Sequence, residues 1–433
     1  MSSIKIFQTH ESLERTYLDY IYYSFAIGTD NISHSTFNRN LSNEISIIHR
    51  KLSNETFQFT RYKLNLLSKG RQKFPREIYI PTIRDRVVLK TIHLYLQDLY
   101  FNELDYKMPQ VIIKEITESI ESYNSYIKID IKNFYPSIDH EKLLTLLKEK
   151  IDCEYSLKLI RKALQPQKNE KIGGVPQGLS ISNILASIYL YQIDKAFQNE
   201  GNIRYFRFVD DILILCNESE IEALKTKINK EFSNLLLEIH PITKKSKSQS
   251  GNIQNNIIEY LGYSFQGDII TVRKSTINNL YSSIIQCFSK FKYSKNKNIG
   301  FLLFQLNLKI TGCIDEGKAK GWIFFFSQIN DLILLKKLDL FVAQNWKKFN
   351  VDPNYLKYLK KFTKAYHEIR FNFKKSNYFN NFDSYNFSQK IGLLENIFNV
   401  STSGLSEAEI NEIFKIKTKS QINKLLIDLR NFS

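Results

Sequence analysis

Two adjacent aspartates lie inside an apolar run of this 433-residue chain. Asp210 and Asp211 occupy RYFRFVDDILIL (204–215), where most other side chains are aromatic or aliphatic. A hairpin turn between two short strands would explain the exposure of one aspartate. It does not explain two, because adjacent carboxylates repel each other and raise each other's pKa unless a cation neutralises them. A divalent metal would supply that cation, since Mg²⁺ binds a few carboxylates together with phosphate oxygens.

A third carboxylate, Asp130, lies in YIKIDIKNFYPSI (126–138) between alternating isoleucines. A lone charge in a buried strand is unfavourable unless it is paired, and Lys128 or Lys132 is an ordinary partner for it. Three carboxylates without nearby histidine or cysteine ligands indicate hard-cation coordination by oxygen alone. Asp130 on a strand and the aspartate pair on a hairpin turn are the minimal set for two-metal phosphoryl transfer. In that chemistry one ion lowers the pKa of an attacking 3′-hydroxyl and the other neutralises the leaving pyrophosphate.

The elements that would position these carboxylates follow from hydrophobic periodicity and from turn residues. Helical spacing covers residues 11–66, with a turn signal, GTDNIS, at 28–33. We expect strands at 76–81, at 125–138 up to a turn at Pro136, in RYFRF and ILIL, and in EYLGYSF (259–265). We expect helices at 85–100, 139–165, 180–197 and 218–236, and a mainly helical pattern from 271 onward.

Composition limits the class of protein. Hydrophobic residues make up 43% of the chain, enough for packed cores. No run of eighteen apolar residues exists, and the N-terminal residues lack the apolar core of a signal peptide. These features predict a cytoplasmic protein without a membrane partner. The four cysteines show no paired spacing, so neither a zinc site nor a disulfide framework is indicated.

Positive charge is concentrated towards the C-terminus. The net charge is +17, and residues 271–433 hold 26 Lys and Arg against 12 Asp and Glu. Lysines interleaved with Tyr and Phe suit a surface that contacts a phosphate backbone, so nucleic acid is the expected partner. A general solubility charge is the alternative explanation.

Taken together, these motifs resemble the palm of reverse transcriptases. Asp130 with Tyr135 five residues later, GVPQGLSISNIL and FVDD have the order and spacing of motifs A, B and C. REIYIPTIRDRVV resembles the fingers motif of bacterial reverse transcriptases, EYLGYSF the strand before the primer grip, and GTDNIS a short N-terminal motif of group II intron enzymes. The resemblance covers about residues 20–265.

The resemblance implies an α+β fold of the right-hand polymerase type. Fingers and a palm with an antiparallel sheet would be followed by an all-α thumb and a C-terminal helical domain. The expected domains are 1–110 for the N-terminal helical region and fingers, 111–270 for the palm, and 271–433 for the basic helical region.

The resemblance also implies roles for individual residues. Asp130, Asp210 and Asp211 would be catalytic and would bind two Mg²⁺ ions, for which Mn²⁺ is a candidate substitute, with Asp211 in a helping role. Tyr135 would stack under the sugar and exclude a 2′-hydroxyl, although an ordinary core aromatic is the alternative. Gln177 and Gly178 would contact the base pair. Arg76 and Lys73 would contact the triphosphate, although Lys73 is otherwise an ordinary surface lysine. Lys245 or Lys244 would contact the leaving pyrophosphate.

Several functions stay open within this resemblance. Asn183 stands where many intron enzymes have proline, and QGLSISNILA resembles the abortive-infection and defence-associated enzymes of bacteria. The expected function is therefore RNA-directed DNA synthesis from dNTPs in bacterial antiviral defence. The alternatives are template-independent, protein-primed DNA synthesis, a retron-like or intron-derived enzyme, and a catalytically dead RNA-binding scaffold. A non-coding RNA and a second copy of the chain are further candidate partners.

Overall fold

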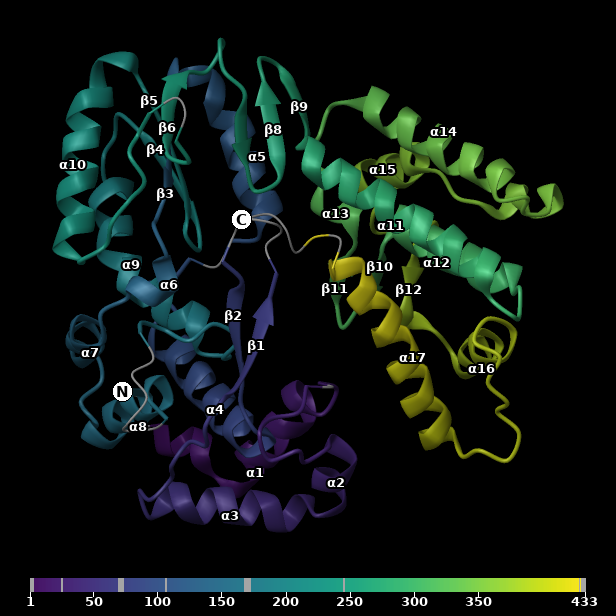
Figure 1. The fold of residues 1–433 in the computed structure, drawn as a ribbon, viewed down its shortest axis with the longest axis horizontal. Coiled ribbons are helices and arrows are strands. Elements are labelled where there is room, and N and C mark those ends of the chain that lie inside the picture. The colour runs from purple at the N-terminus through teal and green to yellow at the C-terminus, as the bar shows by residue number, and fades with distance from the viewer. Residues whose placement is uncertain are drawn as a thin grey trace. The chain divides into compact units, whose positions relative to one another are not determined.

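The computed structural model describes residues 4–24, 26–68, 74–105, 107–166, 173–243, 246–427 and 429. The chain separates into two compact units (Figure 1), of which the first comprises Met1–Lys107 with Ser125–Gly251 and the second Met108–Asn124 with Asn252–Ser433. The expected α+β class is confirmed, and antiparallel strand pairing predominates. The expected boundaries near 110 and 270 stay a prediction. Within the described ranges, no helix is long and apolar enough to cross a membrane.

The first unit is built from helices around one four-stranded sheet. The sheet has the order β4-β5-β3-β6. Its strands are β3 (Ser125–Asp130), β4 (Arg204–Phe208), β5 (Asp211–Cys216) and β6 (Gln249–Asn252); its helices are α1 (His10–Thr16), α2 (His34–Arg39), α3 (Leu41–Ser53), α4 (Ile83–Leu99), α6 (Phe134–Ser137), α7 (His140–Lys148), α8 (Glu154–Leu164), α9 (Ser182–Gln198) and α10 (Ile221–Asn234).

One face of this sheet is packed into the hydrophobic core. Ile127 and Ile129 of β3 are buried together with Ile212 and Ile214 of β5 and with apolar side chains of α9 and α10. Successive side chains of a strand point to opposite faces, so Asp130 and Asp211 lie on the other face. The core thus fixes the strands while leaving these carboxylates outside it.

A second antiparallel pair, β1 (Lys63–Leu67) and β2 (Arg76–Ile80), corrects one expectation. The helical pattern expected over 11–66 ends at Ser53, and Lys63–Leu67 instead pair residue by residue with β2. The expectation of a single helix over 139–165 is also wrong, because this segment forms two separate helices, α7 and α8. The hairpin around the aspartate pair is confirmed, and Asp139 caps α7 by accepting the Lys142 N–H.

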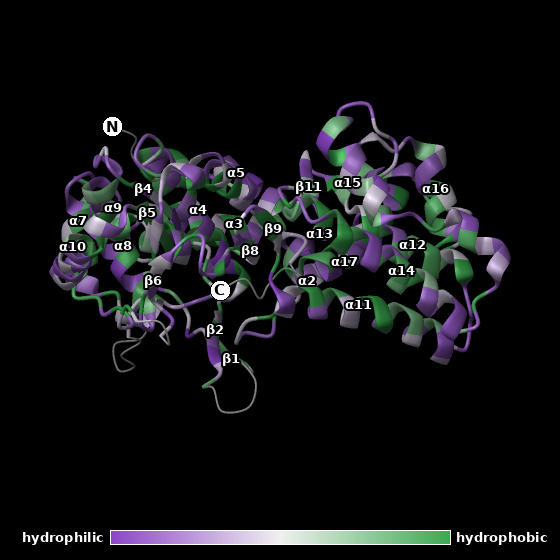
Figure 2. Cartoon of the chain, turned by 90° about the horizontal axis from the view of Figure 1, so that it is seen from above, coloured by the Kyte–Doolittle hydropathy of each residue, from purple (hydrophilic) through white to green (hydrophobic). Residues whose placement is uncertain are grey.

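The second unit is helical apart from two small sheets. Strands β7 (Ile258–Tyr260), β8 (Tyr263–Gln266) and β9 (Ile269–Val272) form one sheet, and β10 (Cys313–Asp315), β11 (Lys318–Lys320) and β12 (Asn380–Asn381) form the other. Its helices are α5 (Pro109–Ser119), α11 (Lys274–Tyr293), α12 (Ile299–Thr311), α13 (Trp322–Phe325), α14 (Leu332–Lys348), α15 (Phe362–Phe371), α16 (Phe387–Asn396) and α17 (Glu407–Ile427). Hydrophobic residues gather around α12 and α13 in the interior of this unit (Figure 2).

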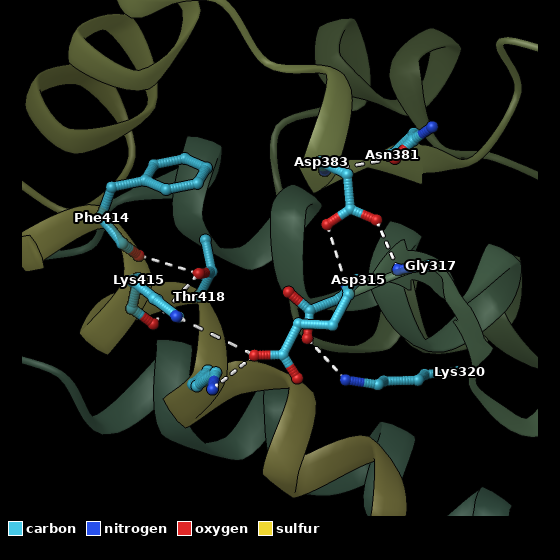
Figure 3. Close-up of polar contacts among 10 residues, drawn as sticks. Asp315, Gly317, Lys320, Asn381, Asp383, Phe414, Lys415 and Thr418 are labelled. Carbon is cyan, nitrogen blue, oxygen red and sulfur yellow. Dashed lines mark hydrogen bonds and ion pairs between the residues drawn. The ribbon is translucent and has the colours of Figure 1, made fainter. Parts of the chain in front are cut away.

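Helix α17 is joined to the β10–β11 turn by polar contacts (Figure 3). The Glu316 carboxylate lies 2.7 Å from Lys419 Nζ and 4.0 Å from Lys415 Nζ. Asp383 holds the turn itself, because its carboxylate accepts the backbone N–H groups of Glu316 and Gly317 at 2.8 Å each. These lysines of α17 therefore have a carboxylate close by.

Candidate active site

The three aspartates meet where β3 and β5 run side by side. Asp130, the last residue of β3, is directly opposite Asp211, the first residue of β5. Asp210 occupies the turn before β5, and Val209 in the same turn has a φ of +58°. A positive φ is strained for a β-branched residue, so the surrounding structure must hold this turn in place.

The Asp210 carboxyl is harder to ionise in this position than it would be in water. Burial raises the pKa of its carboxyl, and the charge of Asp130 raises it further. Backbone hydrogen bonding and the charges of Arg76 and Lys247 act in the opposite direction and do not cancel the rise. Ionising Asp210 in the folded protein therefore costs free energy, chiefly because the carboxyl is buried.

Asp130 is held by the chain that precedes and enters β6. Its Oδ1 lies 3.2 Å from His240 Nε2 and 3.5 Å from Lys247 Nζ. Its backbone N–H donates to Ser248 Oγ at 2.9 Å, and its carbonyl oxygen accepts the His240 N–H at 3.0 Å. The expectation that no histidine lies near the carboxylates is wrong, because His240 contacts Asp130. Sequence reasoning missed His240 and Lys247, since neither has a local pattern that links it to a strand more than a hundred residues earlier.

A buried ion pair braces the aspartate turn from behind. Arg207 on β4 donates through Nε to Asp194 Oδ1 at 2.6 Å, and a second guanidinium nitrogen meets Oδ2. The remaining guanidinium nitrogen donates to the carbonyl oxygen of Val209 at 3.0 Å. Tyr205 also donates to Asp194 at 2.8 Å. The fork-shaped guanidinium thus ties the strained residue to α9.

Sequence reasoning missed Asp194 as well. A signal was present, because Asp194 is a lone charge inside the apolar helix SISNILASIYLYQIDKAF and only 7% of its surface is exposed. A buried carboxylate requires a partner, and the arginine three residues before Asp210 is that partner.

Tyr135 lies close to Asp210, and another segment holds it. Its hydroxyl donates to Asn183 Oδ1 at 2.7 Å, and its carbonyl oxygen accepts the Val175 N–H at 2.8 Å. Burial raises the pKa of Tyr135, and Asp210 adds to the rise while Arg76 and Arg207 oppose it. Asp210 and Arg76 therefore lie close enough to Tyr135 for their charges to affect its pKa.

Gly178 and Gln177 connect this region to β2. The Tyr79 N–H donates to the Gln177 carbonyl oxygen at 2.7 Å. Gly178 has a φ of +104°, and a Cβ added there would lie 2.7 Å from the Tyr79 carbonyl oxygen. Glycine is therefore required for close packing against β2, the strand that begins with Arg76. Among the other expected site residues, Lys73, Lys244 and Lys245 lie outside the described residues.

The carboxylates suit a hard cation by the type of their donor atoms. Asp130, Asp210 and Asp211 offer oxygen ligands only, as Mg²⁺ prefers, and a bound cation would reverse the raised pKa of Asp210. In the part of the chain that the structure describes, no three or more His, Cys, Asp or Glu side chains are already arranged as a metal-binding group.

Comparisons with known proteins agree with this geometry. Residues 67–265 match the family described as reverse transcriptase (RNA-dependent DNA polymerase). The group II intron-encoded protein LtrA of Lactococcus lactis subsp. cremoris is 24% identical over 73% of this chain and 59% of its own length. An uncharacterized 91 kDa protein in a cob intron of Schizosaccharomyces pombe is 31% identical over 36% of this chain and 21% of its own length. The chain thus spans about one to three fifths of these relatives.

Two solved structures are also similar. Telomerase from Candida albicans, in complex with a fragment of telomeric RNA, covers 89% of this chain and 66% of its own chain at 13% identity, with a TM-score of 0.45. Apo telomerase from Candida tropicalis covers 92% of this chain and 78% of its own at 14% identity, with a TM-score of 0.42.

The ion pair behind the turn gives a first prediction. Asp194→Asn leaves the Arg207 guanidinium buried without its carboxylate, so we expect the free energy of unfolding to fall by about 3–5 kcal/mol in urea titrations. Glu238→Gln is the control, because Lys132 and Glu238 form an exposed pair 3.2 Å apart and its loss should change stability by about 0–1 kcal/mol. Equal effects of the two substitutions would contradict the bracing role.

Asp210 gives a second prediction, on pH. Its folded-state pKa lies above its unfolded value, so its charged form destabilises the folded protein. This penalty is absent below the unfolded value of about 3.9 and develops as the pH rises above it. In metal-free buffer, Asp210→Asn should be more stable to urea than the wild type near about pH 7, and the difference should close near about pH 4. The exposed Asp152→Asn should show no such change. A pH-independent difference would contradict the electrostatic explanation.

Proposed function

We propose that this protein is an RNA-directed DNA polymerase that joins dNTPs by two-metal phosphoryl transfer. The observation that carries the proposal is the placement of Asp130 opposite Asp211, next to the Asp210 turn, within the region that matches reverse transcriptases. Two Mg²⁺ ions, when bound, would activate the primer 3′-hydroxyl and neutralise the leaving pyrophosphate. Asp130 and Asp210 would hold them, with Asp211 as a helper.

Other side chains would bind and orient the nucleotide. Arg76 would meet the triphosphate as a charged donor, which its electrostatic effect on Asp210 and Tyr135 supports. The Tyr135 ring would pack under the sugar and exclude a 2′-hydroxyl, and Asn183 would fix that ring through its hydroxyl. The basic second unit would contact the phosphate backbone of the template and product.

We further propose a role in bacterial antiviral defence, which the resemblance of QGLSISNILA to defence-associated enzymes supports. An intron-derived enzyme is the second candidate, and the similarity to the intron-encoded LtrA favours it. Sequencing the DNA product with and without ribonuclease treatment separates templated from template-independent synthesis. A structured RNA gene beside the coding sequence would favour the retron or intron origin.

The catalytic assignment is tested on a primed RNA template. Asp130→Asn and Asp210→Asn should each lower the rate of dNTP incorporation by at least about a hundredfold, since each removes a carboxylate that would hold the metal ions. Asp152→Asn, in the connection between α7 and α8, should retain the wild-type rate. Circular dichroism would show that all variants are folded. A folded Asp210→Asn variant with the wild-type rate would refute the proposal.

The sugar gate gives a separate prediction. Tyr135→Ala should admit ribonucleotides, whereas Tyr135→Phe keeps the ring and should preserve most of the preference for dNTPs. Asn183→Ala removes one hydrogen bond worth about 0.5–1.5 kcal/mol, so the preference should fall by up to about tenfold. The ratio of kcat/KM for dTTP and UTP measures each effect. An unchanged ratio in Tyr135→Ala would exclude the gate.

A further inference from the structure

Two exposed tyrosine rings lie close together in the second unit, outside the region that matches the reverse transcriptase family. They belong to a short 3₁₀ helix, η5 (Pro353–Tyr358), between α14 and α15, whereas the family match ends at residue 265. Tyr355 is 40% exposed and Tyr358 is 58% exposed. Their ring centroids are 6.4 Å apart. Neighbouring aromatic rings on a surface are a candidate contact for a ligand.

The same stretch of chain has an excess of positive charge. Between Asp352 and Glu368 the sequence has four lysines and no aspartate or glutamate. The two flanking carboxylates make local hydrogen bonds. Asp352 Oδ1 accepts the Asn354 N–H at 2.9 Å, and Glu368 Oε2 accepts from Asn372 Nδ2 at 2.9 Å. Residues 353–367, here called the tyrosine–lysine segment, therefore contribute cations and no carboxylate of their own.

Ammonium groups of this segment lie over tyrosine rings. Lys357 Nζ is 5.2 Å from the ring centroid of Tyr358. Lys360 Nζ and Lys364 Nζ are 5.4 Å and 4.8 Å from the ring centroid of Tyr378. A cation is attracted to the face of an aromatic ring, so these distances are favourable. The lysines and the aromatic rings thus share one part of the surface.

Hydrogen bonds fix the backbone of the tyrosine–lysine segment. Asn307 of α12 donates through Nδ2 to the Tyr358 carbonyl oxygen at 3.0 Å. Its Oδ1 accepts the Lys360 N–H at 2.8 Å. The Lys361 N–H donates to the Tyr378 hydroxyl at 2.8 Å. Because the backbone is already held, binding a ligand here costs less conformational entropy than ordering a free loop.

We propose that the tyrosine–lysine segment binds single-stranded nucleic acid, with bases stacked on the exposed rings and phosphates on the lysines. Every base has a face that stacks on an aromatic side chain. In a duplex those faces are covered by neighbouring base pairs. Lys357 and Lys361 are exposed, and their flexible stems let the ammonium groups reach a phosphate. This inference rests on the proposal that the second unit contacts nucleic acid, and it assigns the segment and the single-stranded form.

A purely electrostatic surface makes different predictions. Lysines alone would bind single strands, duplexes and poly-glutamate according to charge, and loss of a ring would leave the affinity unchanged. Stacking instead predicts a preference for single strands. It also predicts that the affinity falls when a ring is removed, with no change in the salt dependence.

The experiment measures fluorescence anisotropy of a labelled oligo(dT) of about ten nucleotides with the full chain, in EDTA and without dNTPs. Under these conditions the result is independent of metal binding by the aspartates, so a failed catalytic assignment leaves this test intact. Tyr358→Ala should weaken binding by about fivefold or more, because it removes one stacked base. Tyr358→Phe keeps the ring and should bind like the wild type.

The lysines are tested by the salt dependence of the same binding. Lys357→Gln with Lys361→Gln should reduce the slope of log affinity against log salt by about 0.7 for each phosphate contact removed. Lys195→Gln with Lys230→Gln is the matched control, because it removes the same charge from exposed positions on α9 and α10. Lys195 also lies over a tyrosine ring, at 4.6 Å. This control should keep the wild-type slope.

Three results would each overturn the proposal. The first is an unchanged affinity in Tyr358→Ala, and the second is the same salt slope in the lysine variant and in its control. The third is equal affinity of the wild type for the oligo(dT) and for a hairpin duplex of the same length. Competition by poly-glutamate as strong as that by unlabelled oligo(dT) would likewise show an electrostatic surface for acidic ligands instead.

Discussion

The main physical constraint on the first unit is that three carboxylates lie close together at the end of a hydrophobic sheet. Like charges repel each other, and burial makes the charged form of Asp210 still less favourable. The isoleucines of β3 and β5 supply the opposing stabilisation, because their burial against α9 and α10 fixes the strands that carry the aspartates. A bound divalent cation would offset the repulsion between these carboxylates.

Long-range polar contacts then determine where each side chain at this site lies. Arg207 ties the strained Val209 carbonyl to Asp194 on α9, and the segment before β6 holds Asp130. Tyr135 is fixed by Asn183, at the start of the same helix α9 that carries Asp194. One helix therefore supports both the aspartate turn and the aromatic ring, which couples the position of the proposed metal site to that of the proposed sugar gate.

The sequence predicted the parts of this site that have local signals. The β4–β5 hairpin and the strand β3 follow from apolar alternation around polar residues. The expected extension of that strand to a turn at Pro136 is wrong, because β3 ends at Asp130 and Phe134–Ser137 form α6. The strand Lys63–Leu67 was not predicted, because its pairing with β2 rather than its own spacing defines it. The Arg207–Asp194 and Tyr135–Asn183 contacts were not predicted either, since they join residues 13 and 48 positions apart without a periodic pattern.

Manganese binding by electron paramagnetic resonance tests the central claim most directly, because free aqueous Mn²⁺ gives a signal that bound Mn²⁺ loses. In the presence of dTTP, the wild type should bind Mn²⁺ that Mg²⁺ displaces. Asp130→Asn and Asp210→Asn should lose this protein-dependent binding, while Asp152→Asn should retain it. Equal Mn²⁺ uptake by the wild type and both folded carboxamide variants would mean that the clustered aspartates do not hold the metal.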